Sequence, residues 1–335
     1  MLLNEFRTRL TEYLVHFLWR QWAQLGLASA AVERRDGWVI DPEALWLLSG
    51  TFARHDARLF DEILDWLAKH SAFINVPRMR SLARRLNFRS VDAVGAMADV
   101  VAHTNSRLHW RFSLPGSNHP AESLFLDMAG TSQPDFGEPD PVFLRFGFKR
   151  GRVDLRGLSR RFNAVMPECA LLRLRALFGT SARAEIALYL LTHEMAHPSL
   201  VARETGFSQK NIQDTLVDMC ASGIVHAAHL EGRQKMYFMK KEHRVPFLHQ
   251  IESAPRWVAW PALFRGLELL ADGVARIAAT DMSTLLQTSE LRQLMSDTQP
   301  YFEMAGFTGP FSSLLLSPGE DVLTSLFSDL QKMLG

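Results

Sequence analysis

The chain has 335 residues, of which 47% are hydrophobic and 22% are charged, and its formal net charge is +1. This composition is typical of a globular protein of two or three domains, and it excludes a low-complexity or solenoid chain. Because the net charge is close to zero, the chain as a whole has no attraction for nucleic acid, and DNA binding would require a local basic surface.

The sequence carries no signal for export or for membrane insertion. Its first residues lack the basic start and apolar core of a secretory signal, and no stretch approaches the roughly 18 uncharged apolar residues that span a bilayer. Cys169 and Cys220 are the only cysteines, too few for a disulfide framework or a thiolate zinc site. We therefore expect a cytoplasmic protein that has reduced cysteines and no contact with a membrane.

Residues 1–112 have the apolar spacing of amphipathic helices. Apolar side chains recur every three or four positions from Phe6 to Trp22, which predicts a first helix. Asp41-Pro42-Glu43 combines a cap, a first-turn proline and a first-turn acid, so a second helix is predicted to begin there. Further helices are predicted over 57–69 and around 77–86. We expect these segments to form a helical N-terminal domain.

Residues 113–175 are expected to form a loop-rich connector, because prolines and glycines interrupt its first half. The segment 142–155 predicts a short β-hairpin within it. The connector also carries a one-sided basic run, whose members are Arg145, Lys149, Arg150, Arg152, Arg156, Arg160 and Arg161. A smaller basic group upstream comprises Arg78, Arg80, Arg84, Arg85 and Arg89. Each group, taken alone, is also typical of a solvated surface.

Residues 176–245 predict three helices followed by two strands. Helices over 181–191 and 199–204 precede a turn at Gly206, where positive φ is needed, and Ser208 caps a third helix that runs to residue 222. Strands are predicted over 224–230 and 236–239, with a basic turn between them. Residues 246–335 return to helical spacing and predict a helical C-terminal domain.

The segment from Ser181 to Met239 resembles the bacterial winged helix-turn-helix repressors of the MarR and ArsR kind. The marks of this resemblance are Ser199-Leu200-Val201-Ala202-Arg203-Glu204-Thr205-Gly206, Ser208-Gln209, Ala221-Ser222-Gly223-Ile224-Val225 and Gly232-Arg233-Gln234-Lys235. The resemblance implies a mainly helical protein with a central winged helix and double-stranded DNA as its partner.

In such a domain the helix that begins at Ser208 would enter the major groove with its N-terminus first. Gln209, Asn211 and Gln213 would read base edges, and Lys210 would reach guanine or phosphate. Asp214 departs from the usual pattern, because a carboxylate repels phosphate and accepts only from a cytosine amino group. The remaining residues of the implied surface are Arg203, Arg233, Gln234 and Lys235, with Arg150, Arg152 and Arg156 extending it along phosphates.

Two other functions fit parts of the sequence. The central domain could serve as a protein-interaction or dimerisation module that does not bind DNA. His193-Glu194-Met195-Ala196-His197 matches the H-E-x-x-H motif of zinc peptidases, which requires both histidines on one helix. Pro198 disfavours helical geometry at His197, and no third ligand stands at the usual spacing. We therefore expect neither zinc nor catalysis at this motif.

These observations lead to one prediction for the whole chain. No phosphate-binding loop, dinucleotide fingerprint or nucleophile elbow is present in the sequence, so we expect no cofactor and no enzyme activity. We predict a sequence-specific transcriptional regulator, a repressor, that acts as a homodimer because one short helix reads too few base pairs. The C-terminal domain is assigned to self-association or to control by a small-molecule or protein effector.

Overall fold

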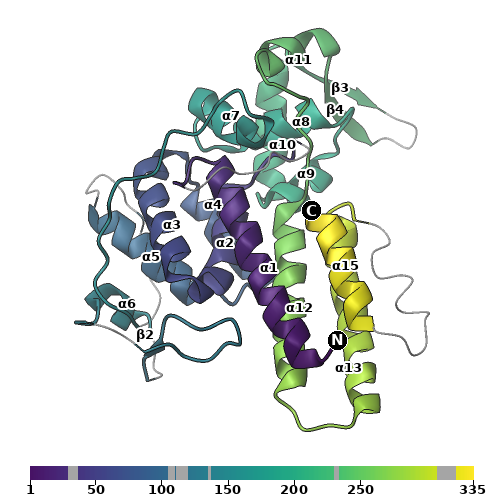
Figure 1. Ribbon diagram of the computed structural model, residues 1–335. Helices are drawn as coiled ribbons and strands as arrows, with labels where there is room; N and C mark the ends of the chain where they lie inside the picture. Colours follow the sequence, from purple (N-terminus) through teal and green to yellow (C-terminus); the bar gives the residue numbers. More distant parts are fainter. Residues whose placement is uncertain (29–36, 105–109, 111–119, 135–136, 230–233, 308–321) are drawn as a thin grey trace.

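The computed structural model describes residues 1–28, 37–104, 110, 120–134, 137–229, 234–307 and 322–335 (Figure 1). Over these residues the chain is mainly helical, and its strands form two small sheets of two strands each. None of the described helices has both the length and the apolarity needed to cross a membrane. The prediction of a mainly helical fold is confirmed.

Helices from distant parts of the sequence share the larger of two hydrophobic cores. They are α1 (Leu3–Gln24), α2 (Pro42–Phe52), α3 (Ala57–His70), α4 (Val76–Leu86), α5 (Val91–Thr104), α12 (Trp260–Ala278), α13 (Thr284–Met304) and α15 (Val322–Leu334), with the short 3-10 turns η1 (Ala53–His55) and η2 (Ser71–Phe73). The ring centroids of Phe17 and Phe264 lie 6.0 Å apart, and those of Phe6 and Phe327 lie 6.3 Å apart. The helical segments expected as an N-terminal domain over 1–112 and a C-terminal domain over 246–335 therefore share one core.

Several helices in this core begin directly after a side chain that caps their first turn. The Asp41 carboxylate accepts a hydrogen bond from a first-turn amide of α2, where Pro42 occupies the first helical position. Asp56 and Asn75 cap α3 and α4 in the same way. Each cap gives a partner to an amide that the helix itself leaves unpaired. The helices predicted near these positions are confirmed.

The central segment builds the second core. Its elements are η3 (Pro167–Cys169), α7 (Ala170–Phe178), α8 (Ala182–Thr192), α9 (Pro198–Thr205), α10 (Gln209–Ala221), β3 (Val225–His229), β4 (Lys235–Met239) and α11 (Lys241–Leu248). β3 and β4 pair antiparallel, with Val225 opposite Met239. Ala196, between α8 and α9, exchanges two backbone hydrogen bonds with Tyr237 of β4, at 2.8 and 2.9 Å. The predicted positions of these helices and strands are confirmed.

The β-hairpin predicted over 142–155 is wrong. The segment forms a short helix, α6 (Pro141–Arg145), and a strand, β2 (Phe148–Lys149), which pairs in parallel with β1 (Glu122–Ser123). The Asp140 carboxylate starts α6 by accepting a hydrogen bond from the amide of Val142 at 2.9 Å. The apolar residues that indicated a strand therefore belong to a capped helical turn, and Phe143 is the one that it buries.

Candidate nucleic-acid interface

The first turn of α10 is open to solvent. Ser208 caps the helix, because its Oγ accepts a hydrogen bond from the amide of Asn211 at 3.2 Å. Gln209, Lys210 and Asn211 are all exposed. Along the whole helix only Ile212 and Leu216 are fully buried, and Met219 and Cys220 are partly buried against the same core. This is the geometry that the sequence predicts for a helix able to enter a groove.

Further along α10, two predicted contact residues have different surroundings. Gln213 is partly buried, and its Nε2 donates to the hydroxyl of Tyr237 at 2.9 Å, so its amide already has a partner in β4. Asp214 is exposed. Asp218, one turn later, forms an ion pair with Arg183 of α8 at 3.3 Å. The outward face of α10 therefore carries negative as well as positive charge.

The predicted contacts beyond α10 lie on α9 and on β4. Arg203 is exposed near the end of α9, with its guanidinium 3.8 Å from the Glu204 carboxylate. Gln234 and Lys235 are exposed, and Lys235 belongs to β4, with its Nζ 5.3 Å from the centre of the Tyr237 ring. Arg233 lies outside the described residues.

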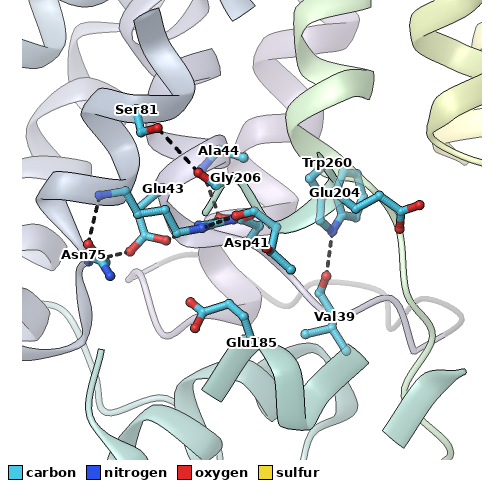
Figure 2. A network of polar contacts seen from close by, with 12 residues as sticks. Val39, Asp41, Glu43, Ala44, Asn75, Ser81, Glu185, Glu204, Gly206 and Trp260 are labelled. Atoms are coloured by element: carbon cyan, nitrogen blue, oxygen red, sulfur yellow. Dashed lines mark hydrogen bonds and ion pairs between the residues drawn. The ribbon is translucent and has the colours of Figure 1, made fainter. Parts of the chain in front are cut away.

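The turn between α9 and α10 is fixed to α4. Gly206 has φ of +85°, and a Cβ added there would lie only 2.4 Å from a methyl carbon of Leu82. Arg78 Nε donates to the carbonyl of Thr205 at 2.5 Å. The Ser81 hydroxyl donates to the carbonyl of Gly206 at 3.4 Å (Figure 2). The position of α10 therefore depends on the helical body and not on the central segment alone.

A buried ion network joins the two cores at the same place. It consists of Asp41, Glu43, Arg78, Arg175 and Glu185, drawn from the start of α2 and from α4, α7 and α8. Arg175 donates to both oxygens of Glu43, at 2.6 and 2.7 Å, and to Glu185 at 2.5 Å. Burial alone would raise the pKa of Asp41, but Arg78, Arg175 and the Ala44 amide together lower it. Figure 2 shows the carboxylates of Glu43 and Asp41 converging between the helices.

Arginines of α4 and α8 lie near the start of α10. A cavity of about 590 Å³ lies between the start of α4, the start of α8 and the start of α10, and its lining includes Arg80, Arg183 and Ser208. Arg84 is exposed one turn after Arg80 on α4. Arg85 donates to the carbonyl of residue 203 in α9 at 3.0 Å. Arg80 and Arg85 thus lie beside the turn that precedes α10, which their sequence position alone did not indicate.

Within the larger basic run, Arg150 is not on a surface, which corrects the role assigned to it. Arg150 is 5% exposed and pairs with Asp61 of α3 at 2.7 Å, inside a ring of phenylalanines. Arg152 pairs with Glu138 at 3.0 Å. Arg156 is exposed near Glu62, where burial raises the carboxyl pKa and nearby arginines partly offset the rise. The segment packs along α3, and α6 and β2 lie far from β3 and β4 (Figure 1).

The H-E-x-x-H residues do not share a helix. α8 ends at Thr192, and His193 has the extended backbone of φ −124° and ψ 149°. His197 is the cap of α9. The His193 ring stacks on Tyr189 with centroids 3.9 Å apart, and burial lowers the pKa of this histidine. Within the described residues no group of three or more His, Cys, Asp and Glu side chains is arranged to hold a metal ion.

We expect a chelator to leave the melting temperature of the purified protein unchanged. The reason is that the two histidines of the motif lie on either side of an extended segment, at the end of one helix and the start of the next. The measurement is thermal unfolding with and without EDTA, together with elemental analysis. One zinc per chain that is lost on changing His193 or His197 to alanine would contradict this prediction.

Comparison with known proteins adds no relative to this description. No protein-family model, curated protein or solved structure matches the chain.

Proposed function

We propose that the chain binds double-stranded DNA through α10 and acts as a sequence-specific transcriptional repressor. The observation that carries this proposal is the exposed polar first turn of α10, with arginines of α4 beside it. Helix N-termini attract phosphate because their amides are unpaired and their dipole is positive, and arginine side chains add to this attraction. Side chains on such a turn can reach base edges in the major groove.

The arrangement around α10 supports a winged helix-turn-helix. The β3–β4 pair follows α8, α9 and α10 in the chain. Ala196 forms an antiparallel bridge with Tyr237 of β4, as a third strand would. In a winged helix the third helix enters the groove while the strands and their connecting turn contact the backbone beside it. Lys235 at the start of β4 fits such a contact, because it is exposed and lies at the end of the pair nearest the connecting turn.

The environment of each side chain divides the proposed contacts into two classes. Gln209 and Asn211 are exposed and can form paired hydrogen bonds with adenine, so they are the proposed base readers. Lys210, Arg80 and Arg84 are the proposed phosphate contacts, which set position without reading sequence. Gln213 contributes less, because Tyr237 already holds its amide. Two half-sites read by a homodimer would supply the specificity that one short helix lacks.

We expect Arg80→Gln/Arg84→Gln to weaken binding to all duplexes alike and to flatten its salt dependence. Each lost phosphate contact should lower the slope of log affinity against log salt by about 0.9, because fewer counterions are released. The measurement is fluorescence anisotropy at several salt concentrations, with a duplex selected from a random library. Arg152→Gln is the control, because it removes an exposed arginine from the far segment.

Base reading is tested separately with Gln209→Ala. This change should lower the preference for one base position by about 1–3 kcal/mol while leaving the salt slope unchanged. If no duplex is enriched at low salt, the DNA proposal fails and α10 belongs instead to a protein-interaction module. Asp214 and Asp218 favour that second function, because carboxylates on the outward face repel phosphate.

A further inference from the structure

A second cavity lies in the helical body, away from α10. Its volume is about 470 Å³, within the range of small-molecule sites. It is bounded by the start of α1, the ends of α2 and α12, the start of α5 and the loop from β1 to residue 130. Apolar side chains, among them Phe52, Met128 and Phe148, form part of its wall, so it can hold an apolar body.

Among the arginines of the cavity wall, Arg7 is the one that has no carboxylate partner among the described residues. Arg54 pairs with Glu122 at 2.8 Å, and Arg89 pairs with Asp272 at 2.9 Å. Arg7 of α1 has no ion pair with any described residue, and its guanidinium lies close to Gly130, 3.2 Å from where a Cβ would be. A cation in a cavity of this kind favours an anionic group that can accept from its paired N–H donors.

Two further groups in the wall bear on the ligand. Burial lowers the pKa of His55, although its hydrogen bond to the carbonyl of Asp127 opposes this, so the cavity disfavours a charge on the ring. Asp92 is exposed in the wall and has no ion pair with Arg7 or any other described residue. Its carboxylate, with those of Glu122 and Asp272, would repel a second negative charge on a ligand.

A buried hydroxyl marks the inner wall. Ser90 is 4% exposed, and its Oγ has no hydrogen-bond partner among the described residues. Most buried polar groups in proteins have a partner, and this hydroxyl belongs to a residue of the cavity wall. Ser90 lies just before α5 and close to Gly50 of α2. A Cβ added to that glycine would be 2.7 Å from the Ser90 Cβ.

We propose that this cavity binds a small monocarboxylate with an apolar body. The carboxylate pairs with Arg7, the apolar body lies along the phenylalanine and methionine side chains, and Ser90 supplies a hydrogen bond. The site does not share any residue with α10, so the inference does not depend on the DNA proposal.

The proposal is tested by calorimetric titration of the full chain with benzoate, benzamide and phthalate. Benzamide has the shape of benzoate without its charge, and phthalate carries a second carboxylate. We expect benzoate to bind more tightly than either, and Arg7→Gln to weaken benzoate binding about tenfold or more, the usual cost of losing a charge-assisted hydrogen bond. Arg276→Gln is the control, because it removes an exposed arginine of α12 that does not line the cavity.

Two further variants keep the test independent of folding. Ser90→Ala should weaken benzoate binding without lowering the melting temperature, because the hydroxyl has no partner to lose. Ala275→Leu should fill the cavity and abolish binding. Benzoate that binds no better than benzamide, or that binds Arg7→Gln as well as the wild-type chain, would overturn the proposal.

Discussion

Replacing Arg175 with methionine is expected to lower the free energy of unfolding by about 3–5 kcal/mol, the usual cost of removing one partner from a buried ion pair. Arg175 is the only described residue that donates to Glu185, so the variant leaves that carboxylate buried without a partner. Glu43 keeps donors from Arg78 and from the amide of Asn75. The loss is therefore concentrated on Glu185, which is 1% exposed.

The measurement is urea unfolding, with Arg183→Met as the matched control. Arg183 also pairs with a carboxylate, but this pair is exposed, and its loss should change stability by about 1 kcal/mol or less. The double variant Arg175→Met/Glu185→Met should recover part of the stability, because it removes the unpaired carboxylate and keeps apolar volume in the core. A single variant as stable as the wild-type chain would show that the network is not a structural tie between the two cores.

Replacing Gly206 with alanine is expected to lower the free energy of unfolding by about 2–5 kcal/mol. About 1–2 kcal/mol comes from placing a side chain at a positive φ, and about 1–3 kcal/mol from crowding Leu82. Leu82 is fully buried, so it has little room to move away from a new methyl group 2.4 Å from its own. Because the turn would have to shift away from α4, we also expect the variant to lose affinity for DNA.

Gly223→Ala separates the cost of a side chain at positive φ from the cost of crowding Leu82. Gly223 ends α10 with φ of +74°, but nothing lies within 4 Å of a Cβ added there. The variant should therefore lose only the backbone contribution of about 1–2 kcal/mol. Equal losses at the two glycines would show that α4 does not hold the turn. The comparison uses urea unfolding for stability and fluorescence anisotropy for DNA binding.

Local signals in the sequence predicted much of the fold. The Asp41-Pro42 start of α2 and the Ser208 cap of α10 were correct, because a cap depends on a side chain and an amide only a few residues apart. The end of α8 before His193 was also correct. The hairpin over 142–155 was wrong, because a run of apolar residues fits a strand or a helical turn equally well until the Asp140 cap is considered.

The arrangement in space could not be predicted in the same way. Arg150 counts as a basic residue in any sequence window, yet Asp61, Phe60 and Phe125 from other parts of the chain surround it. The position of Arg80 beside Ser208 likewise depends on packing between α4 and the turn at Gly206. Such neighbours are far apart in the sequence, so neither spacing nor periodicity indicates them.

The shared helical core cannot close until its C-terminal helices have been synthesised. α1 to α5 leave the ribosome well before α12, and at ordinary synthesis rates the interval is on the order of ten seconds or more. During that time the rings that later meet Phe264 and Phe327 have no partner. The second core, built almost entirely from α7 to α11, can close first. The nascent chain therefore carries a nearly complete central segment beside an unfinished helical body, which is the stage at which aggregation or chaperone binding would act.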